Sequence, residues 1–245
     1  MRLTIDLVQD RATQTVDPNN QRAMVLRGFK ISAIENLGIT RDMYGCIDLS
    51  DNEIFRIENI PKLARLRSLI LANNSISWIA QDAFDQLPEL TSLVLTNNKV
   101  SRLSVLLPIA NLRRLERLSL VHNPVTKEPR YREFVIHLMK YSRTFRYLDF
   151  QRVTDQERQD SKAFFSTPEG VLMLRRLVPE QAAAEAESRE LQTKAAAKPV
   201  LSDEVLDKIK IAIMETEDMD VVNRLERCLK TGELTADVAR LIGIE

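Results

Sequence analysis

The sequence predicts an α/β fold, a solenoid in which short strands alternate with return segments, because one spacing of apolar residues recurs along the chain. Each copy of the spacing ends in an asparagine and one further apolar residue. The three clearest copies are Leu66-x-x-Leu69-x-Leu71-x-x-Asn74-x-Ile76, Leu90-x-x-Leu93-x-Leu95-x-x-Asn98-x-Val100 and Leu115-x-x-Leu118-x-Leu120-x-x-Asn123-x-Val125. A fourth copy contains Tyr44, Ile47, Leu49, Asn52 and Ile54. The four asparagines are separated by 22, 24 and 25 residues, so one structural unit is repeated in step.

The period and the spacing are those of a leucine-rich repeat. We expect each copy to form one coil, with its leucines in a core shared with the neighbouring coils and its strand in a parallel sheet on the concave side. The asparagine should turn inward and bond the backbone at the bend, where no strand neighbour exists. Leu26 and Ile31 begin a further coil in which Phe29 takes the asparagine position, so this first coil should be the most irregular.

Both ends of such a solenoid need caps, because an end coil would otherwise expose its core. Residues 1–22 are the predicted N-terminal cap, in which Leu3, Leu7 and Val8 are spaced for a short helix. The repeats and a C-terminal repeat cap are assigned to residues 23–178.

The C-terminal cap is predicted from local signals. Residues 131–138 carry apolar side chains at helical spacing, and residues 147–150 favour one last strand. Thr154 and Glu157 form a capping box that should start a second helix. A third helix should begin at Thr167-Pro168 and end near Leu177.

The remainder of the chain differs in composition from the repeats. Residues 179–200 are predicted to be a linker, because no apolar face recurs in them. Residues 201–245 are predicted to form a helical tail module, since Ser202, Asp220 and Thr235 can each cap a short amphipathic helix. The module either packs on itself or docks on a partner, and the sequence favours neither interpretation.

Composition and motifs exclude several classes of protein. No apolar run approaches 18 residues, so we expect a soluble intracellular protein without a membrane partner. Cys46 and Cys228 lie too far apart in sequence to suggest a disulfide or zinc framework. No phosphate-binding glycine loop, nucleophile motif or zinc-binding histidine pair occurs, and His122 and His137 are explained more simply as turn and packing residues. The sequence therefore predicts no enzyme, no cofactor and no metal.

The net charge of zero conceals a division of charge along the chain. Residues 113–152 contain 10 lysines and arginines against 4 acidic residues, a net charge of +6, whereas residues 180–245 contain 9 against 15, a net charge of −6. The basic stretch is either a solvated face or an edge that meets phosphates. Few aromatic residues are interleaved with it, so we expect no base stacking by this chain alone.

The predicted concave face carries candidate binding residues, because side chains between the core leucines point out of the sheet. Five of them are apolar: Val25, Ile70, Ala72, Val94 and Val121. The polar candidates on the same face are Arg27, Asp48, Thr96, Arg117 and Asp149. Isolated surface hydrophobes are common. Their clustering on one face favours a protein partner instead, and a helix would suit a curved groove.

Several segments, taken together, resemble one family of leucine-rich repeat proteins. They are MRLTIDLVQ, LRGFKISAIENLG, IDLSDNEI, LVLTNNKV, NPVTKEPRYREFVI and YLDFQRVTDQER, which occur in this order within residues 1–160, and a later helical segment, DEVLDKIKIAIMETEDMDVVNRLERCLKTGEL. The chain is similar in these segments to the A-prime proteins of the U-two small nuclear ribonucleoprotein. The stretch around Trp78 and the linker at 180–199 do not contribute to the resemblance.

This resemblance implies a nuclear, non-catalytic scaffold of the spliceosome. Its concave face would bind the RNA-recognition domain of the B-double-prime protein, and the two proteins together would bind stem-loop four of the U-two snRNA. We expect Arg143, Arg146 and Arg152 to lie near that RNA in the complex, and the tail to be available to other proteins of the particle.

Two other classes of repeat protein remain as alternatives. A phosphatase-regulating repeat protein, or another intracellular adaptor, would share the coils and the cap but usually has more repeats at a regular 22-residue period. An acidic histone-binding repeat protein would end in a long run of Asp and Glu, whereas this tail mixes both signs of charge.

Overall fold

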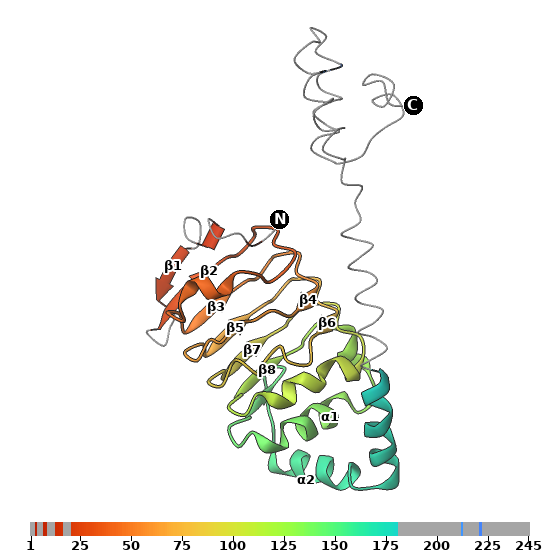
Figure 1. The fold of residues 1–245 in the computed structure, drawn as a ribbon. Helices are drawn as coiled ribbons and strands as arrows, with labels where there is room; N and C mark the ends of the chain where they lie inside the picture. The colour runs from red at the N-terminus through yellow and green to blue at the C-terminus, as the bar shows by residue number, and fades with distance from the viewer. Residues whose placement is uncertain are drawn as a thin grey trace. The chain divides into compact units, whose positions relative to one another are not determined.

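The computed structural model describes residues 3, 7–8, 13–16, 21–180, 212 and 221 of the chain (Figure 1). The chain divides into two compact units, Met1–Glu185 and Ala186–Glu245. In the second unit only Ala212 and Val221 are described, and both are helical. The predicted tail module therefore lies outside the described residues except at these two positions, and the predicted linker does so except at residues 179 and 180.

One eight-stranded sheet runs through the first unit, in the order β1-β2-β3-β5-β7-β8-β9-β10. Neighbouring strands from β2 to β9 are parallel, and only the two end pairs, β1 with β2 and β9 with β10, are antiparallel. The strands are β1 (Thr13–Val16), β2 (Arg22–Val25), β3 (Cys46–Asp48), β5 (Ser68–Ile70), β7 (Ser92–Val94), β8 (Arg117–Ser119), β9 (Tyr147–Leu148) and β10 (Gln151–Arg152). The parallel leucine-rich repeat sheet predicted from the spacing is confirmed.

The return segments lie across each coil from the sheet (Figure 1). A second, two-stranded parallel sheet pairs β4 (Arg56–Ile57) with β6 (Trp78–Ile79). Four 3₁₀ helices complete these segments in the described part of the chain: η2 (Leu37–Thr40), η3 (Leu103–Asn111), η4 (Pro124–Lys127) and η5 (Met139–Tyr141). The leucines of the repeat frames are buried between the sheet and the return segments in one continuous core.

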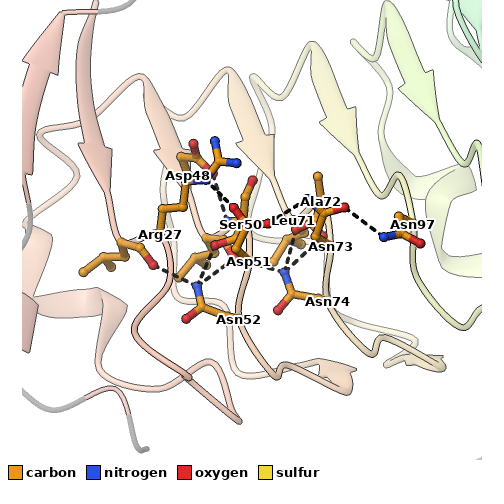
Figure 2. Close-up of polar contacts among 12 residues, drawn as sticks. Arg27, Asp48, Ser50, Asp51, Asn52, Leu71, Ala72, Asn73, Asn74 and Asn97 are labelled. Atoms are coloured by element: carbon orange, nitrogen blue, oxygen red, sulfur yellow. Dashed lines mark hydrogen bonds and ion pairs between the residues drawn. The ribbon is translucent and has the colours of Figure 1, made fainter.

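The repeat asparagines bond the backbone as the spacing predicts. The amide nitrogen of Asn98 donates to the carbonyls of Leu71, Leu95 and Thr96 at 2.9, 3.0 and 3.3 Å, and its oxygen accepts from the Ile76 amide at 3.0 Å. Asn52 and Asn74 repeat this pattern in earlier coils (Figure 2). Each side chain therefore joins its own coil to the preceding one and satisfies buried backbone groups.

The helices of the C-terminal cap agree with their sequence signals, but the single strand predicted for residues 147–150 is wrong beyond Leu148. Strand β9 ends at Leu148, because Asp149 and Phe150 form a turn with φ of 53° and 63°, and β10 then runs back antiparallel to β9. Helix α1 (Tyr131–Leu138) spans the residues of its apolar pattern, and helix α2 (Asp155–Phe164) begins directly after Thr154, as the capping box predicts. The capping box at the start of α2 is present, because the Glu157 amide donates to Thr154 Oγ1 at 3.2 Å and the Thr154 amide donates to Glu157 Oε2 at 2.8 Å. The third helix begins at residue 168 and is still helical at residue 180, beyond the predicted end near Leu177.

The described part of the N-terminal cap is consistent with the predicted short helix and adds a strand that was not predicted. Leu3, Leu7 and Val8 are buried, and the last two are in a helical turn, while the other residues of the predicted helix lie outside the described ones. Strand β1 was not predicted, and its antiparallel pairing with β2 covers the edge of the first coil. No helix among the described residues is long and apolar enough to cross a membrane.

Candidate partner interface

The apolar candidates on the sheet are brought into register by the parallel pairing. The pairing aligns Val25 with Asp48, Asp48 with Ile70, and Ile70 with Val94, so these four residues form one column across four strands. Along β5 and β7 the middle leucine is buried and the residues beside it are half-buried, which is the alternation expected of side chains that leave the core. The column is therefore a band of apolar side chains, interrupted by one carboxylate and open to a partner.

A second column borders the first at the ends of the strands. Ala72, Thr96 and Val121 are half-buried there, and the Thr96 hydroxyl lies 2.8 Å from the hydroxyl of Ser119. Arg27 is exposed at the first coil. Together the two columns present a surface that is apolar at its centre and polar at its edge.

The charged candidates at the first two coils are held by nearby groups. Arg27 forms an ion pair with Asp51 rather than with Asp48. The Asp48 carboxylate accepts a hydrogen bond from the Ser50 amide at 2.9 Å, which fixes its orientation (Figure 2). Arg27 and Asp48 thus stand on the candidate face in ordered positions.

A row of polar side chains follows the strand ends, and sequence reasoning missed it. Asn97 Nδ2 donates to Asn73 Oδ1 at 2.9 Å, and Asn73 Nδ2 donates to Asp51 Oδ1 at 2.7 Å (Figure 2). We call Arg27, Asp51, Asn73 and Asn97 the polar ladder. The hydrogen bond from Asn73, assisted by Arg27, holds the pKa of Asp51 below its usual value, so the ladder contains a carboxylate at neutral pH.

A sequence signal for the polar ladder existed. The residue before each repeat asparagine has a positive φ, from 54° at Asn97 to 62° at His122. Asparagine, aspartate and glycine tolerate this backbone better than other residues do. Their recurrence immediately before the repeat asparagine predicts a tight turn, with these side chains stacked from coil to coil.

The two candidates near the last coil behave differently from each other. Arg117 is exposed and lies with its guanidinium 5.9 Å from the centre of the Tyr147 ring. Both oxygens of the Asp149 carboxylate are used within the chain, one by the Leu120 amide at 2.6 Å and the other by the Tyr131 hydroxyl at 2.8 Å. Burial and the Asp149 charge raise the pKa of Tyr131, so this hydroxyl keeps its proton and remains a donor. Asp149 therefore lies in the turn between β9 and β10, outside the strand column predicted for it, and links the Leu120 backbone to α1.

The basic stretch is separated by the structure into paired and unpaired side chains. Three arginines form ion pairs: Arg114 with Glu89 at 2.5 Å, Arg130 with Glu133 at 2.6 Å, and Arg132 with Glu157 at 2.6 Å. Within residues 21–180, Arg143, Arg146 and Arg152 are exposed and have no ion-pair partner, and neither does Lys127. The three arginines predicted to lie near RNA are thus among the charges that remain available.

Exposed aromatic rings accompany these charges, which differs from the sequence expectation. Tyr141 is 63% exposed, Tyr147 39% and Phe150 77%. Arg113 and Lys140 each lie 5.1 Å from the centre of the Tyr141 ring. The count of aromatic residues in the sequence is low, but the fold leaves three of them at the surface of the cap, where rings and cations alternate.

The two histidines occupy a turn and a packed position, as predicted. His122 is exposed at a turn with φ of 62°. Burial against Phe165, and to a lesser extent the Lys140 charge, lowers the pKa of His137 to about 4, so its ring is neutral at pH 7. Among the residues that the structure describes, no three histidine, cysteine or acidic side chains are grouped to hold a metal ion.

Comparison with known proteins gives consistent results. A family model described as leucine-rich repeat matches residues 1–178. The U2 small nuclear ribonucleoprotein A′ of Homo sapiens is 35% identical over 96% of this chain and 89% of its own length, and that of Arabidopsis thaliana is 36% identical over 96% and 93%. The crystal structure of the Drosophila melanogaster SNF/U2A′ complex contains a chain that is 38% identical, with a TM-score of 0.66, over 72% of this chain and 99% of that one.

The family model covers more than half of the chain, and the relatives span nearly all of it at more than 30% identity. The chain therefore belongs to the U2 small nuclear ribonucleoprotein A′ family of non-catalytic leucine-rich repeat proteins.

Proposed function

We propose that this chain is a scaffold of the U2 ribonucleoprotein that binds the RNA-recognition domain of a B-double-prime protein on its concave face. The observation that carries the proposal is the column of half-buried Val25, Ile70 and Val94, aligned across neighbouring strands. Apolar side chains gathered on one face are the usual mark of a protein interface. A solved relative, the U2A′ chain of Drosophila, is itself in a complex with the protein SNF, which supports a protein partner of this kind.

The geometry favours a helix of the partner as the element that enters the groove. An amphipathic helix places an apolar stripe along one side, which can lie on the column, and polar residues beside it. Those polar residues would meet Arg27 and Asp48 at the first coils, and Arg117 at the fifth strand of the parallel run. Fixed charges at the rim set the register of a partner more than they add affinity.

The RNA part of the proposal concerns the cap. Arg143, Arg146 and Arg152 supply positive charge that no ion pair within residues 21–180 neutralises. In the complex they would lie near stem-loop four of the U2 snRNA held by the partner. By linkage, each component would then tighten binding of the other, typically by about 1–3 kcal/mol. A nuclear location and further contacts of the tail with other proteins of the particle belong to the same proposal.

A pull-down from nuclear extract tests the proposal against its main alternative. We expect the tagged chain to recover an RNA-recognition-motif protein together with U2 snRNA, and a Val94→Asp variant to recover less of both. The matched control is Val178→Asp, the same substitution at an exposed valine of the third cap helix, off the concave sheet. Recovery of a phosphatase catalytic subunit in place of the RNA-binding protein would support a phosphatase-regulating adaptor instead.

A further inference from the structure

A cavity in the C-terminal cap has no role in the proposed docking of a partner on the sheet. It has a volume of about 590 Å³ and opens between α1 with η5 on one side and α2 on the other. The residues that line it are Ile136, His137, Lys140, Tyr141, Arg158, Ser161, Lys162, Phe165 and Ser166.

The charges of this cap cavity have one sign. Lys140, Arg158 and Lys162 line it, and no aspartate or glutamate is among its lining residues. Arg158 and Lys162 are four residues apart on α2 and so lie on one face of the helix. The Arg158 guanidinium donates to the Phe145 carbonyl, which anchors one end of the group and leaves its other donors for a ligand. Three cations from two helical elements therefore converge on one space, and an anion is the ligand that they suit.

Three rings, those of His137, Tyr141 and Phe165, form part of the uncharged wall of the cavity, beside Ile136 and two serines. His137 and Phe165 lie 4.4 Å apart between ring centres, at an interplanar angle of 40°. Because burial lowers the pKa of His137 to about 4, its ring adds no charge at neutral pH. Tyr141 stands at the rim and is 63% exposed. The wall thus combines a cationic side with an aromatic side, and the ligand needs both an anionic group and an apolar, planar group.

We propose that the cap cavity binds one nucleotide of a single-stranded RNA segment, with a phosphate on Lys140, Arg158 and Lys162 and the base against the exposed ring of Tyr141. Single-stranded RNA offers unstacked bases that can enter such a site, whereas a duplex hides them. This inference goes beyond the scaffold function, because it needs neither the concave face nor the partner protein.

The surroundings of the cavity favour a polynucleotide over a phosphorylated peptide. Positive charge continues beyond the cavity. The Arg113 guanidinium lies 5.1 Å from the centre of the Tyr141 ring at the rim, and Arg143 follows Tyr141 by two residues in the chain. A single phosphate group on a peptide would use the three cavity cations and leave these two without a partner. A chain with a phosphate on every nucleotide can meet both sets of charges.

The test measures binding of a fluorescein-labelled oligouridylate to the full chain, without any partner, by fluorescence anisotropy over a series of salt concentrations. The variant Lys140→Gln/Lys162→Gln removes two cations of the cavity. Its control, Lys62→Gln/Lys99→Gln, removes two exposed lysines that do not line the cavity. We expect the cavity variant to weaken binding and to lower the slope of log affinity against log salt by about 1.4, which is two lost phosphate contacts on a single strand. The control should match the wild type.

A second variant tests whether the aromatic side of the cavity binds the base, at a position where a substitution should leave the fold intact. Tyr141→Ala alters a ring that is mostly exposed, and we expect it to weaken oligouridylate binding about five-fold, the lower end of the effect of one stacked base. In the wild type, 4-thiouridine in the same RNA should crosslink to Tyr141 on irradiation, and mass spectrometry locates the crosslink. Equal affinities of the cavity variant and its control would overturn the proposal. So would tighter binding of a phosphoserine peptide that displaces the RNA, since the site would then belong to a protein ligand.

Discussion

The concave sheet and the C-terminal cap share one core, but their surfaces differ in chemical character. The sheet carries a regular column of half-buried apolar residues, and its charged groups at Arg27 and Asp48 are held by neighbours. The cap carries exposed rings and arginines without acidic partners among the described residues, placed irregularly. The repeat imposes one side-chain direction at each position of every coil, which suits an extended apolar contact. The cap does not follow the repeat, so basic side chains can gather on it, and a surface with gathered positive charge suits RNA binding.

The largest expected effect is on the sheet. Ile70→Asp should leave the fold intact, because the side chain is only half-buried, but it should place a carboxylate in a desolvated contact with the partner. We expect a loss of about 2–5 kcal/mol in binding to the RNA-recognition domain. Isothermal titration measures this, with Val178→Asp as the control of equal chemistry. Wild-type affinity in Ile70→Asp would remove the concave face from the interface.

Two neighbouring asparagines on one turn, Asn97 and Asn98, should differ in their effect on the free energy of unfolding. Asn98→Ala leaves buried backbone groups unpaired and should lower the free energy of unfolding by about 1–3 kcal/mol. The adjacent Asn97→Gly removes a member of the exposed polar ladder and suits the positive φ, so its effect should stay within about 0.5 kcal/mol. Urea denaturation of both variants gives the comparison. Equal stability of the two would contradict the assigned roles of the neighbouring asparagines.

The arginines of the cap should affect RNA and spare the protein partner. Replacing Arg143, Arg146 and Arg152 together with glutamine should weaken binding of stem-loop RNA to the complex, and each lost phosphate contact should reduce the salt slope by about 1. The affinity between the two proteins should not change. Lys62, Arg65 and Lys99, all exposed and outside the cap, form the matched triple control. Unchanged salt slopes in the cap variant would return these arginines to the solvated-face interpretation.

The smallest effect concerns the acid stability of the cap. The hydrogen bond from Arg132, with help from Thr154, lowers the pKa of Glu157 from 4.5 to about 2. Because the folded pKa is depressed, the stabilisation is complete above pH 4.5 and is lost as the pH falls from about 4.5 to about 2. Glu157→Gln should therefore melt earlier than wild type at pH 7, and the two melting temperatures should converge in acid. A difference that stays constant down to pH 2 would show that the ionised carboxylate is not the source.

The sequence was sufficient for features that depend on local spacing. The asparagine bonds, the columns of the sheet, α1 and the capping box all follow from residues a few positions apart or from a repeated frame, so pattern alone predicts them. Strand β1 was missed because its only partner is β2, and no spacing within residues 13–16 distinguishes an edge strand from a cap helix. The first coil should still be the most irregular, because Phe29 replaces its asparagine.

Other features depended on contacts between distant residues. The spacing of Asp149 predicts a place in the concave column, but the chain turns there after β9, and Tyr131, eighteen residues away in sequence, binds its carboxylate. The cap cavity unites Lys140 with Arg158 and Lys162 from another helix, and no motif links them. The polar ladder could have been predicted from the sequence, but only the positive φ at these positions explains why its residue types recur. Site residues are thus harder to predict than the fold wherever a side chain has several possible bonding partners that are distant in sequence.

The central claim is that the middle of the concave sheet touches the protein partner, and site-directed photocrosslinking tests it most directly. Ser92 lies two residues from Val94 on β7, so its side chain leaves the same face of the sheet, and it is half-buried. A benzophenone amino acid at position 92 should crosslink to the RNA-recognition domain on irradiation, and the same group at position 178 should not. Crosslinking from position 178 with none from position 92 would contradict the account and place the partner on the cap.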